Sequence, residues 1–160
     1  MRPLLFTILS LAAQPAAGDI SLAFPLDCQL DQDCHIQQFV DHDPSSGASD
    51  FACGSLTYDG HKGTDIALPS LAAQAAGVNV LAAASGVVRG ARNDMRDVLQ
   101  GTRDAPDVSE RECGNGVVLD HGDGIETQYC HMARGSVVVA TGETVQAGQV
   151  LGQVGLSGET

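Results

Sequence analysis

The stretch that decides the fold is "NGVVLDHGDGIETQYCHM", residues 115–132. Two runs of β-type residues flank "HGDG", and a glycine-rich turn between two such runs is a strong signal for a β-hairpin. In the second run, strict alternation would place Tyr129 and His131 on the same face of the strand. Gln128 and Cys130 would then lie on the opposite face. The stretch therefore predicts two antiparallel strands, with a histidine at the end of the second.

The rest of the chain also favours β structure. After this hairpin, "GETVQAGQVLGQVGLSG" (142–158) continues as short valine and leucine runs punctuated by glycines, and "SLAAQAAG" (70–77) has the composition of one or two helical turns. Only 4% of the residues are aromatic and 19 are glycines. This composition predicts an all-β domain of curved antiparallel sheets with long loops and few helices.

One segment interrupts the pattern. Residues 91–112 are polar, carry four of the eight basic residues and lack a clear period. We expect a long surface excursion between two strands, with part of it helical.

The N-terminus has the features of a secretory signal peptide. Arg2 is followed by the apolar run "PLLFTILSLAA", and small residues precede Asp19. The run is too short for a comfortable membrane span, and no second stretch is long enough, so no stable membrane insertion is expected. We predict a signal peptide at 1–18, a cysteine-bounded segment at 19–54 packed on the domain, and a main β domain at 55–160. The mature protein would be exported, either periplasmic or secreted.

Five cysteines are compatible with an oxidising compartment. Cys28 and Cys34 are close enough in sequence to close a small loop, and Cys113 and Cys130 flank the predicted hairpin. Cys53 would then remain as a free thiol, an intermolecular partner, or the partner of a residue beyond the given C-terminus. The sequence does not settle these pairings. Because no spacing is C-x-x-C, a structural zinc knuckle is not expected.

The charge of the chain excludes one class of partner. There are 8 Lys and Arg against 20 Asp and Glu, for a formal net charge of −12. Such a surface repels nucleic acid and offers no basic stripe for it. Neutral or cationic partners are favoured.

A candidate metal site lies in "YDGHKGTDIALPS", residues 58–70. His61 precedes Asp65 by four residues. The intervening glycines and Pro69 argue against a helix and favour a strand leading into a loop, in which both side chains could converge on one metal ion. The alternative is that the two residues only hydrogen-bond within a turn.

The other histidines are expected to have different roles. His131, at the end of its strand, is the second candidate for chemistry. His121 lies at the hairpin turn, where we expect it to make structural hydrogen bonds. His35 and His42 lie in the cysteine-bounded segment and show no ligand spacing.

Several of these motifs occur together in one order. "GHKGTDIALPS", "GNGVVLDHGDGIETQYCHM" and "GETVQAGQVLGQVGLSG" resemble the lysostaphin-like, or LytM-type, zinc metallopeptidases that cut peptide cross-links in bacterial cell walls. The resemblance covers residues 55–160 and implies a barrel-sandwich hybrid-like fold. It implies that His61 and Asp65 are two zinc ligands. It also implies that His131 is an active-site histidine, with Met132 in the family's usual leucine position.

The chain departs from the family pattern at its C-terminal end. In the family, a stretch like "GLSGET" leads into an H-x-H motif that holds the third zinc ligand and the second catalytic histidine. The given sequence ends at Thr160, before such a motif. A catalytic zinc site has three protein ligands and a water. We therefore expect the chain to be part of a longer protein, with a naturally short, inactive form as the alternative.

The resemblance implies a function and a cofactor. It predicts a metalloendopeptidase that hydrolyses peptide bonds of peptidoglycan, with one Zn²⁺ per domain that lowers the pKa of a bound water towards about 7 and polarises the scissile carbonyl. His131 would orient the water or bind the developing oxyanion, and the excursion at 91–112 could form one wall of a peptide groove.

Two other functions remain at this stage. One is a catalytically inactive relative that binds cell-wall peptide or regulates another wall hydrolase. The other is a carrier module, because "GETVQAGQVLG" resembles the hairpins of biotinyl and lipoyl domains. That reading is weakest, since no lysine stands at the expected tip.

Overall fold

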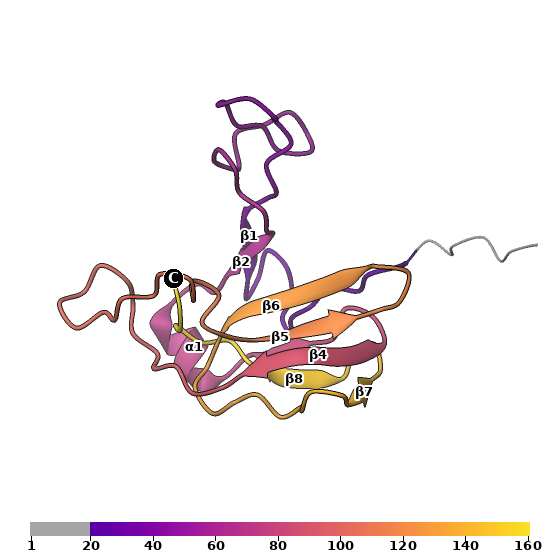
Figure 1. The fold of residues 1–160 in the computed structure, drawn as a ribbon. Coiled ribbons are helices and arrows are strands. Elements are labelled where there is room, and N and C mark those ends of the chain that lie inside the picture. Colours follow the sequence, from indigo (N-terminus) through magenta and orange to yellow (C-terminus); the bar gives the residue numbers. More distant parts are fainter. Residues whose placement is uncertain (1–19) are drawn as a thin grey trace, which may run out of the picture.

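The computed structural model describes residues 20–160, so the predicted signal peptide at 1–18 lies outside the described part. The regular secondary structure of the described chain is almost entirely antiparallel strands, joined by long loops (Figure 1), which confirms the all-β prediction. Its elements are β1 (His35–Gln38), β2 (Asp65–Ala67), α1 (Leu71–Ala76), β3 (Asn79–Leu81), β4 (Gly86–Arg92), β5 (Asn115–Asp120), β6 (Glu126–Met132), β7 (Thr144–Val145) and β8 (Val150–Gln153).

The largest sheet has four strands in the order β6-β5-β4-β7. Its centre is the predicted hairpin, in which Asp120 of β5 is paired with Glu126 of β6. The turn is closed by His121 N–H donating to the carbonyl of Ile125 at 2.9 Å. Gly122 and Gly124 have φ of 86° and 76°, a conformation that side chains with a Cβ rarely adopt. The "HGDG" motif is thus required by the geometry of the turn.

The core lies between this sheet and the two-stranded β3–β8 sheet. Its buried side chains come from both sheets and from the turns that join them: Val80, Ala82, Ala83, Val88, Val117, Leu119, Tyr129, Met132, Val139, Val145 and Leu151. The hydroxyl of Tyr129 is buried with the ring and accepts a hydrogen bond from Ala83 N–H at 2.8 Å. This bond satisfies a polar group that would otherwise be costly inside the core.

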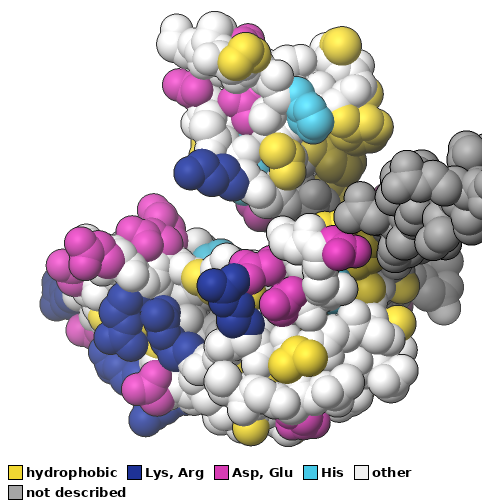
Figure 2. All heavy atoms as spheres, turned by 45° about the vertical axis from the view of Figure 1, so that its right-hand side comes forward, with side chains coloured by type: hydrophobic (Ala, Val, Ile, Leu, Met, Phe, Trp, Pro, Cys, Tyr) yellow, Lys and Arg dark blue, Asp and Glu magenta, His cyan; other side chains and the backbone are white. Residues whose placement is uncertain are grey.

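Residues 23–27 run along β3 and are joined to residues 79–83 by backbone hydrogen bonds. The chain then passes through the Cys28–Cys34 disulfide, one of the two predicted pairs, into β1. β1 pairs with β2, and residues 39–64 between them protrude from the rest of the molecule (Figures 1 and 2). Within residues 20–160, no helix has the length and apolar character needed to span a membrane.

The excursion between β4 and β5 is a loop without a helix, so the expectation of partial helicity was wrong. Carboxylates along the segment bind backbone N–H groups and compete with helix formation. Asp107 makes such a local bond, accepting from Ser109 N–H. Asp97 instead accepts from the N–H groups of Arg134 and Leu156, which lie outside the segment. The Asp97 contacts hold the excursion against the end of β6 and the C-terminal segment.

Candidate metal and active site

The two predicted metal ligands lie close together. His61 is in the loop before β2 and Asp65 is the first residue of β2, with His61 Nε2 3.4 Å from Asp65 Oδ2. The His61 side chain is 8% exposed and that of Asp65 is 46% exposed. The sequence predicted a strand leading into a loop, and the order is the reverse. The chain bends at Gly60, whose φ is 75°, and β-pairing with β1 begins only at Asp65.

The loop that carries His61 is held by Asp41. One oxygen of this carboxylate accepts from Gly60 N–H at 2.9 Å, and the other accepts from Asp43 and Ser49 N–H at 3.0 Å each. These backbone N–H groups, that of Ser49 foremost, hold the pKa of Asp41 below its usual value. The N–H of Asp41 also donates to the carbonyl of His61 at 2.8 Å. Sequence reasoning missed this residue, although "DHDPSS" is typical of carboxylate-capped turns.

The His61–Asp65 pair has the chemistry of a metal donor set. Nε2 of His61 is buried and has no hydrogen-bond partner, which is unusual for a buried ring nitrogen. The ring of Tyr58 lies 4.4 Å from that of His61 and helps to cover it. Gly63 stands beside the pair, and a Cβ there would lie 3.9 Å from Nε2 and 3.5 Å from a carboxylate oxygen of Asp65. An imidazole nitrogen and a carboxylate are both common zinc donors.

A third donor is not found beside this pair in the part of the chain that the structure describes. Among residues 20–160, no group of three or more His, Cys, Asp and Glu is placed to hold a metal ion. An open hollow of about 550 Å³ adjoins His61 and is lined by residues 40, 41, 43–45 and 59–62, among them Lys62. The site therefore supplies two donors, and Asp65 is not among the residues that line this hollow.

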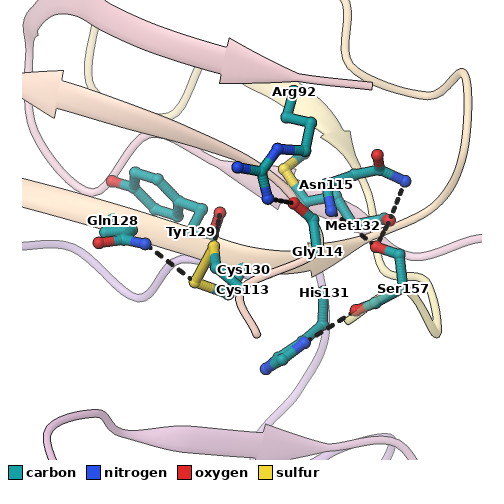
Figure 3. Close-up of a disulfide and its surroundings, with 10 residues drawn as sticks. All are labelled: Arg92, Cys113, Gly114, Asn115, Gln128, Tyr129, Cys130, His131, Met132 and Ser157. Atoms are coloured by element: carbon teal, nitrogen blue, oxygen red, sulfur yellow. Dashed lines mark hydrogen bonds between the residues drawn. A yellow bond between two sulfur atoms is a disulfide. The ribbon is translucent and has the colours of Figure 1, made fainter. Parts of the chain in front are cut away.

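His131 occupies an unusual backbone position at the end of β6. Its φ is 57°, and the register between β5 and β6 shifts between Asn115 and Val117, so that the extra residue lies on β6. The alternation expected from the sequence is broken at this bulge. Tyr129 and Met132 are both buried in the core, whereas His131 is half-buried and its ring points in a different direction from that of Tyr129 (Figure 3).

Four interactions surround His131, and in one of them its carbonyl accepts from Gly155 N–H at 2.8 Å. Its N–H donates to the carbonyl of Cys113 at 2.8 Å, and its Nδ1 lies 2.9 Å from the carbonyl oxygen of Ser157. The residue before it, Cys130, forms the second predicted disulfide with Cys113 (Figure 3). The histidine is thus attached to the base of the excursion and to the C-terminal segment.

Asn115 organises the buried polar network behind His131. It is fully buried, its side chain bonds both the N–H and the carbonyl of Met95 at 2.8 Å, and it also donates to the carbonyl of Met132. The hydroxyl of the buried Ser157 accepts from Asn115 N–H and donates to the Met132 carbonyl. Neither residue was singled out from the sequence. The "GNG" around Asn115 was the available signal for an exceptional backbone.

The remaining histidines and the fifth cysteine take no part in this site. His121 lies 2.8 Å from both the carbonyl of Ser85 and the hydroxyl of Thr127, which confirms its structural role. His35 and His42 are exposed. Cys53 is a free, exposed thiol.

The protein has an antiparallel β fold with a buried histidine beside a carboxylate and a further histidine at a strand end. These features define an all-β domain with a candidate hydrolytic metal site. Comparison with known families is more specific. The model of Peptidase family M23 matches residues 59–160, and the chain belongs to this family. The match includes His61, Asp65 and His131, and it confirms the resemblance to LytM-type peptidases. A search of curated proteins found no match.

Proposed function

We propose that this protein is an exported, zinc-dependent metalloendopeptidase that hydrolyses peptide bonds of peptidoglycan. Membership of a peptidase family supports peptide hydrolysis. The observation that carries the zinc part of the proposal is the buried, unpartnered Nε2 of His61 beside Asp65. Two disulfides are compatible with an oxidising compartment outside the cytoplasm.

In this proposal His61 and Asp65 hold the ion and His131 handles a proton. When bound, zinc would act as a Lewis acid on the scissile carbonyl and lower the pKa of a bound water. Asp41 would keep the His61 loop in the ligating conformation through its bonds to Gly60 and Ser49. The burial of His61 excludes water from its ring and leaves Nε2 free for the ion.

The test combines metal content with cleavage of isolated peptidoglycan, measured as the release of new amino groups. It uses the longest form of the protein that the coding sequence supplies. His61→Ala and Asp65→Ala should each lose both zinc and cleavage. His131→Ala should keep zinc and lose cleavage by about 10²- to 10³-fold, the usual effect of removing one group that stabilises a transition state.

His35→Ala and His42→Ala are matched controls, because both histidines are exposed and lie in the same N-terminal part of the chain. They should keep zinc and activity. A protein that binds peptidoglycan without releasing amino groups would instead be the inactive, regulatory relative. A protein whose zinc content is unchanged in His61→Ala would contradict the proposed ligands.

A further inference from the structure

The neutral form of His131 is restricted by its surroundings to one arrangement of its proton. Its Nδ1 lies 2.9 Å from the carbonyl oxygen of Ser157. A carbonyl oxygen can only accept a hydrogen bond, so Nδ1 must carry the proton. The other ring nitrogen, Nε2, is then an acceptor. In many functional histidines, the hydrogen bond made by one ring nitrogen determines which of the two nitrogens carries the proton.

The Ser157 carbonyl is itself held in place. The hydroxyl of Ser157 bonds the N–H of Asn115 and the carbonyl of Met132 at 2.8 and 2.7 Å. Both contacts are buried, and Asn115 is also anchored to Met95. The acceptor that faces Nδ1 therefore belongs to a rigid network.

The Cys113–Cys130 disulfide fixes the backbone of His131 from the other side. Cys130 is bonded directly to His131 along the chain, and the carbonyl of Cys113 accepts its N–H at 2.8 Å. The cross-link therefore joins the residue before His131 to the residue that binds it. His131 has a φ of 57°, which a residue with a side chain keeps only when its surroundings impose it.

We propose that the Cys113–Cys130 disulfide and the Ser157 carbonyl are positioning elements that hold neutral His131 as the Nδ1–H tautomer, with Nε2 as a preformed proton acceptor. The catalytic use of Nε2 rests on the proposed function, whereas the tautomer and its dependence on the disulfide do not. The disulfide is thus assigned a role in orienting a reactive side chain, in addition to any contribution to stability.

The first experiment reads the tautomer by ¹⁵N nuclear magnetic resonance of the imidazole rings in the given chain. Spectra are recorded at a pH of about 8.5, about two units above the ordinary pKa of histidine. The His131 signals are assigned by their loss in His131→Gln. We expect a protonated-type shift at Nδ1 and an unprotonated-type shift at Nε2. A protonated Nε2 would overturn the proposal.

The second experiment compares two disulfide deletions. In Cys113→Ala/Cys130→Ala the His131 ring should show averaged shifts from both tautomers, because its backbone is then held by hydrogen bonds alone, without a covalent cross-link. Cys28→Ala/Cys34→Ala removes the other cross-link, far along the chain, and should leave the His131 shifts unchanged. Unchanged shifts in both double variants would overturn the positioning role of the Cys113–Cys130 bond.

If the first double variant does not fold, the same bond can be broken in folded protein. In the Cys28→Ala/Cys34→Ala background, a small dithiol supplies two electrons and two protons, converts Cys113 and Cys130 to thiols and becomes a cyclic disulfide. Both cysteines are half-buried and so partly accessible. The His131 shifts should average on reduction and recover on reoxidation, while the shifts of His121 stay constant. Constant His131 shifts through complete reduction would contradict the proposal.

In a form that cleaves peptide, loss of this bond should lower kcat by at least about 10-fold with little change in KM, because a slightly misplaced group costs rate more than binding. Failure of the proposed function would show as absence of cleavage with the Nδ1–H tautomer intact. Failure of the present inference would show as an unaffected tautomer and kcat.

Discussion

The two parts of the molecule that carry the candidate residues are built differently. His131 stands at the end of the four-stranded sheet, where a disulfide, a buried asparagine and the C-terminal segment converge on it. His61 lies in the protruding residues 39–64, and Asp65 follows them as the first residue of β2, which attaches this part to the body through the two-stranded β1–β2 sheet (Figure 1). There the chain is held by backbone N–H groups that donate to the carboxylates of Asp41 and Asp50, which are near them in sequence.

The two candidate histidines differ in how their ring nitrogens are bonded. The His131 ring has a defined hydrogen-bond partner, whereas the His61 ring is left with a buried nitrogen that lacks one. The first is positioned by the fold alone. In the proposed function, the second would be completed by a bound metal ion. Side-chain type is also distributed unevenly: Figure 2 shows hydrophobic side chains gathered on one side of the protruding part, while lysine and arginine collect mainly on the body.

The largest effect on stability is expected at the buried network. Asn115→Ala should lower the free energy of unfolding by about 4 kcal/mol, because it leaves the N–H and carbonyl of Met95 buried without partners, at about 1–3 kcal/mol each. Urea denaturation measures this. Asn79→Ala is the control, since its side chain makes only an exposed hydrogen bond to Asp27 and should cost less than about 0.5 kcal/mol. Equal losses of unfolding free energy in the two variants would contradict the view that the network around Asn115 is rigid.

The two disulfides are expected to make similar contributions to the stability of the protein. Their sequence separations are 17 and 6 residues. Loop-closure entropy then predicts losses of about 3 kcal/mol for Cys113–Cys130 and about 2 kcal/mol for Cys28–Cys34. Thermal unfolding of the two double alanine variants tests this. A loss for Cys113–Cys130 smaller than that for Cys28–Cys34 would contradict the loop-closure explanation of their contributions to stability.

Acid should loosen the protruding part of the molecule, where Asp41 holds the loop that carries His61. The folded-state pKa of Asp41 is lowered by its backbone partners, so its contribution to stability is present above the unfolded value of about 3.9 and is lost as the pH falls through the lower folded value. The amide resonances of Gly60 and Ser49 should therefore shift below a pH of about 4. In Asp41→Asn this transition should be missing. A transition near neutral pH would show that a titrating group other than Asp41 holds the loop.

The smallest effect is expected on the exposed side of the protruding part. Phe51 is 66% exposed and makes an edge contact with Phe39 at 4.8 Å between ring centroids. Phe51→Ala should cost less than about 1 kcal/mol of unfolding free energy. Leu119→Ala, at a fully buried position of the sheet, should cost about 2–5 kcal/mol by the same measurement. A cost at Phe51 comparable to that at Leu119 would mean that the protruding part has a core of its own.

Local sequence signals were sufficient for part of this structure. The glycines of "HGDG" specify a turn, the Ala-rich stretch gave α1, and the short spacing of Cys28 and Cys34 suggested their bond. Each of these features is decided by residues that are neighbours along the chain. The family resemblance followed from motifs of the same kind.

Long-range pairing was not accessible in the same way. The bulge at His131 depends on how β5 and β6 come into register, and a shift of one residue changes which face every later side chain occupies. β1 pairs with β2 across an intervening loop, so the position of His61 outside the strand could not be read from its own neighbours. The Asn115–Ser157 contact joins residues 42 positions apart.

The central claim is that His61 and Asp65 are metal ligands, and it is tested most directly by anomalous X-ray diffraction at the zinc absorption edge from crystals grown with zinc. If both residues are ligands, we expect one strong peak within about 2.0–2.2 Å of both His61 Nε2 and an oxygen of Asp65. Crystals of His61→Ala should lack that peak. A fully occupied zinc bound elsewhere, with His61 Nε2 still free of metal, would contradict the account.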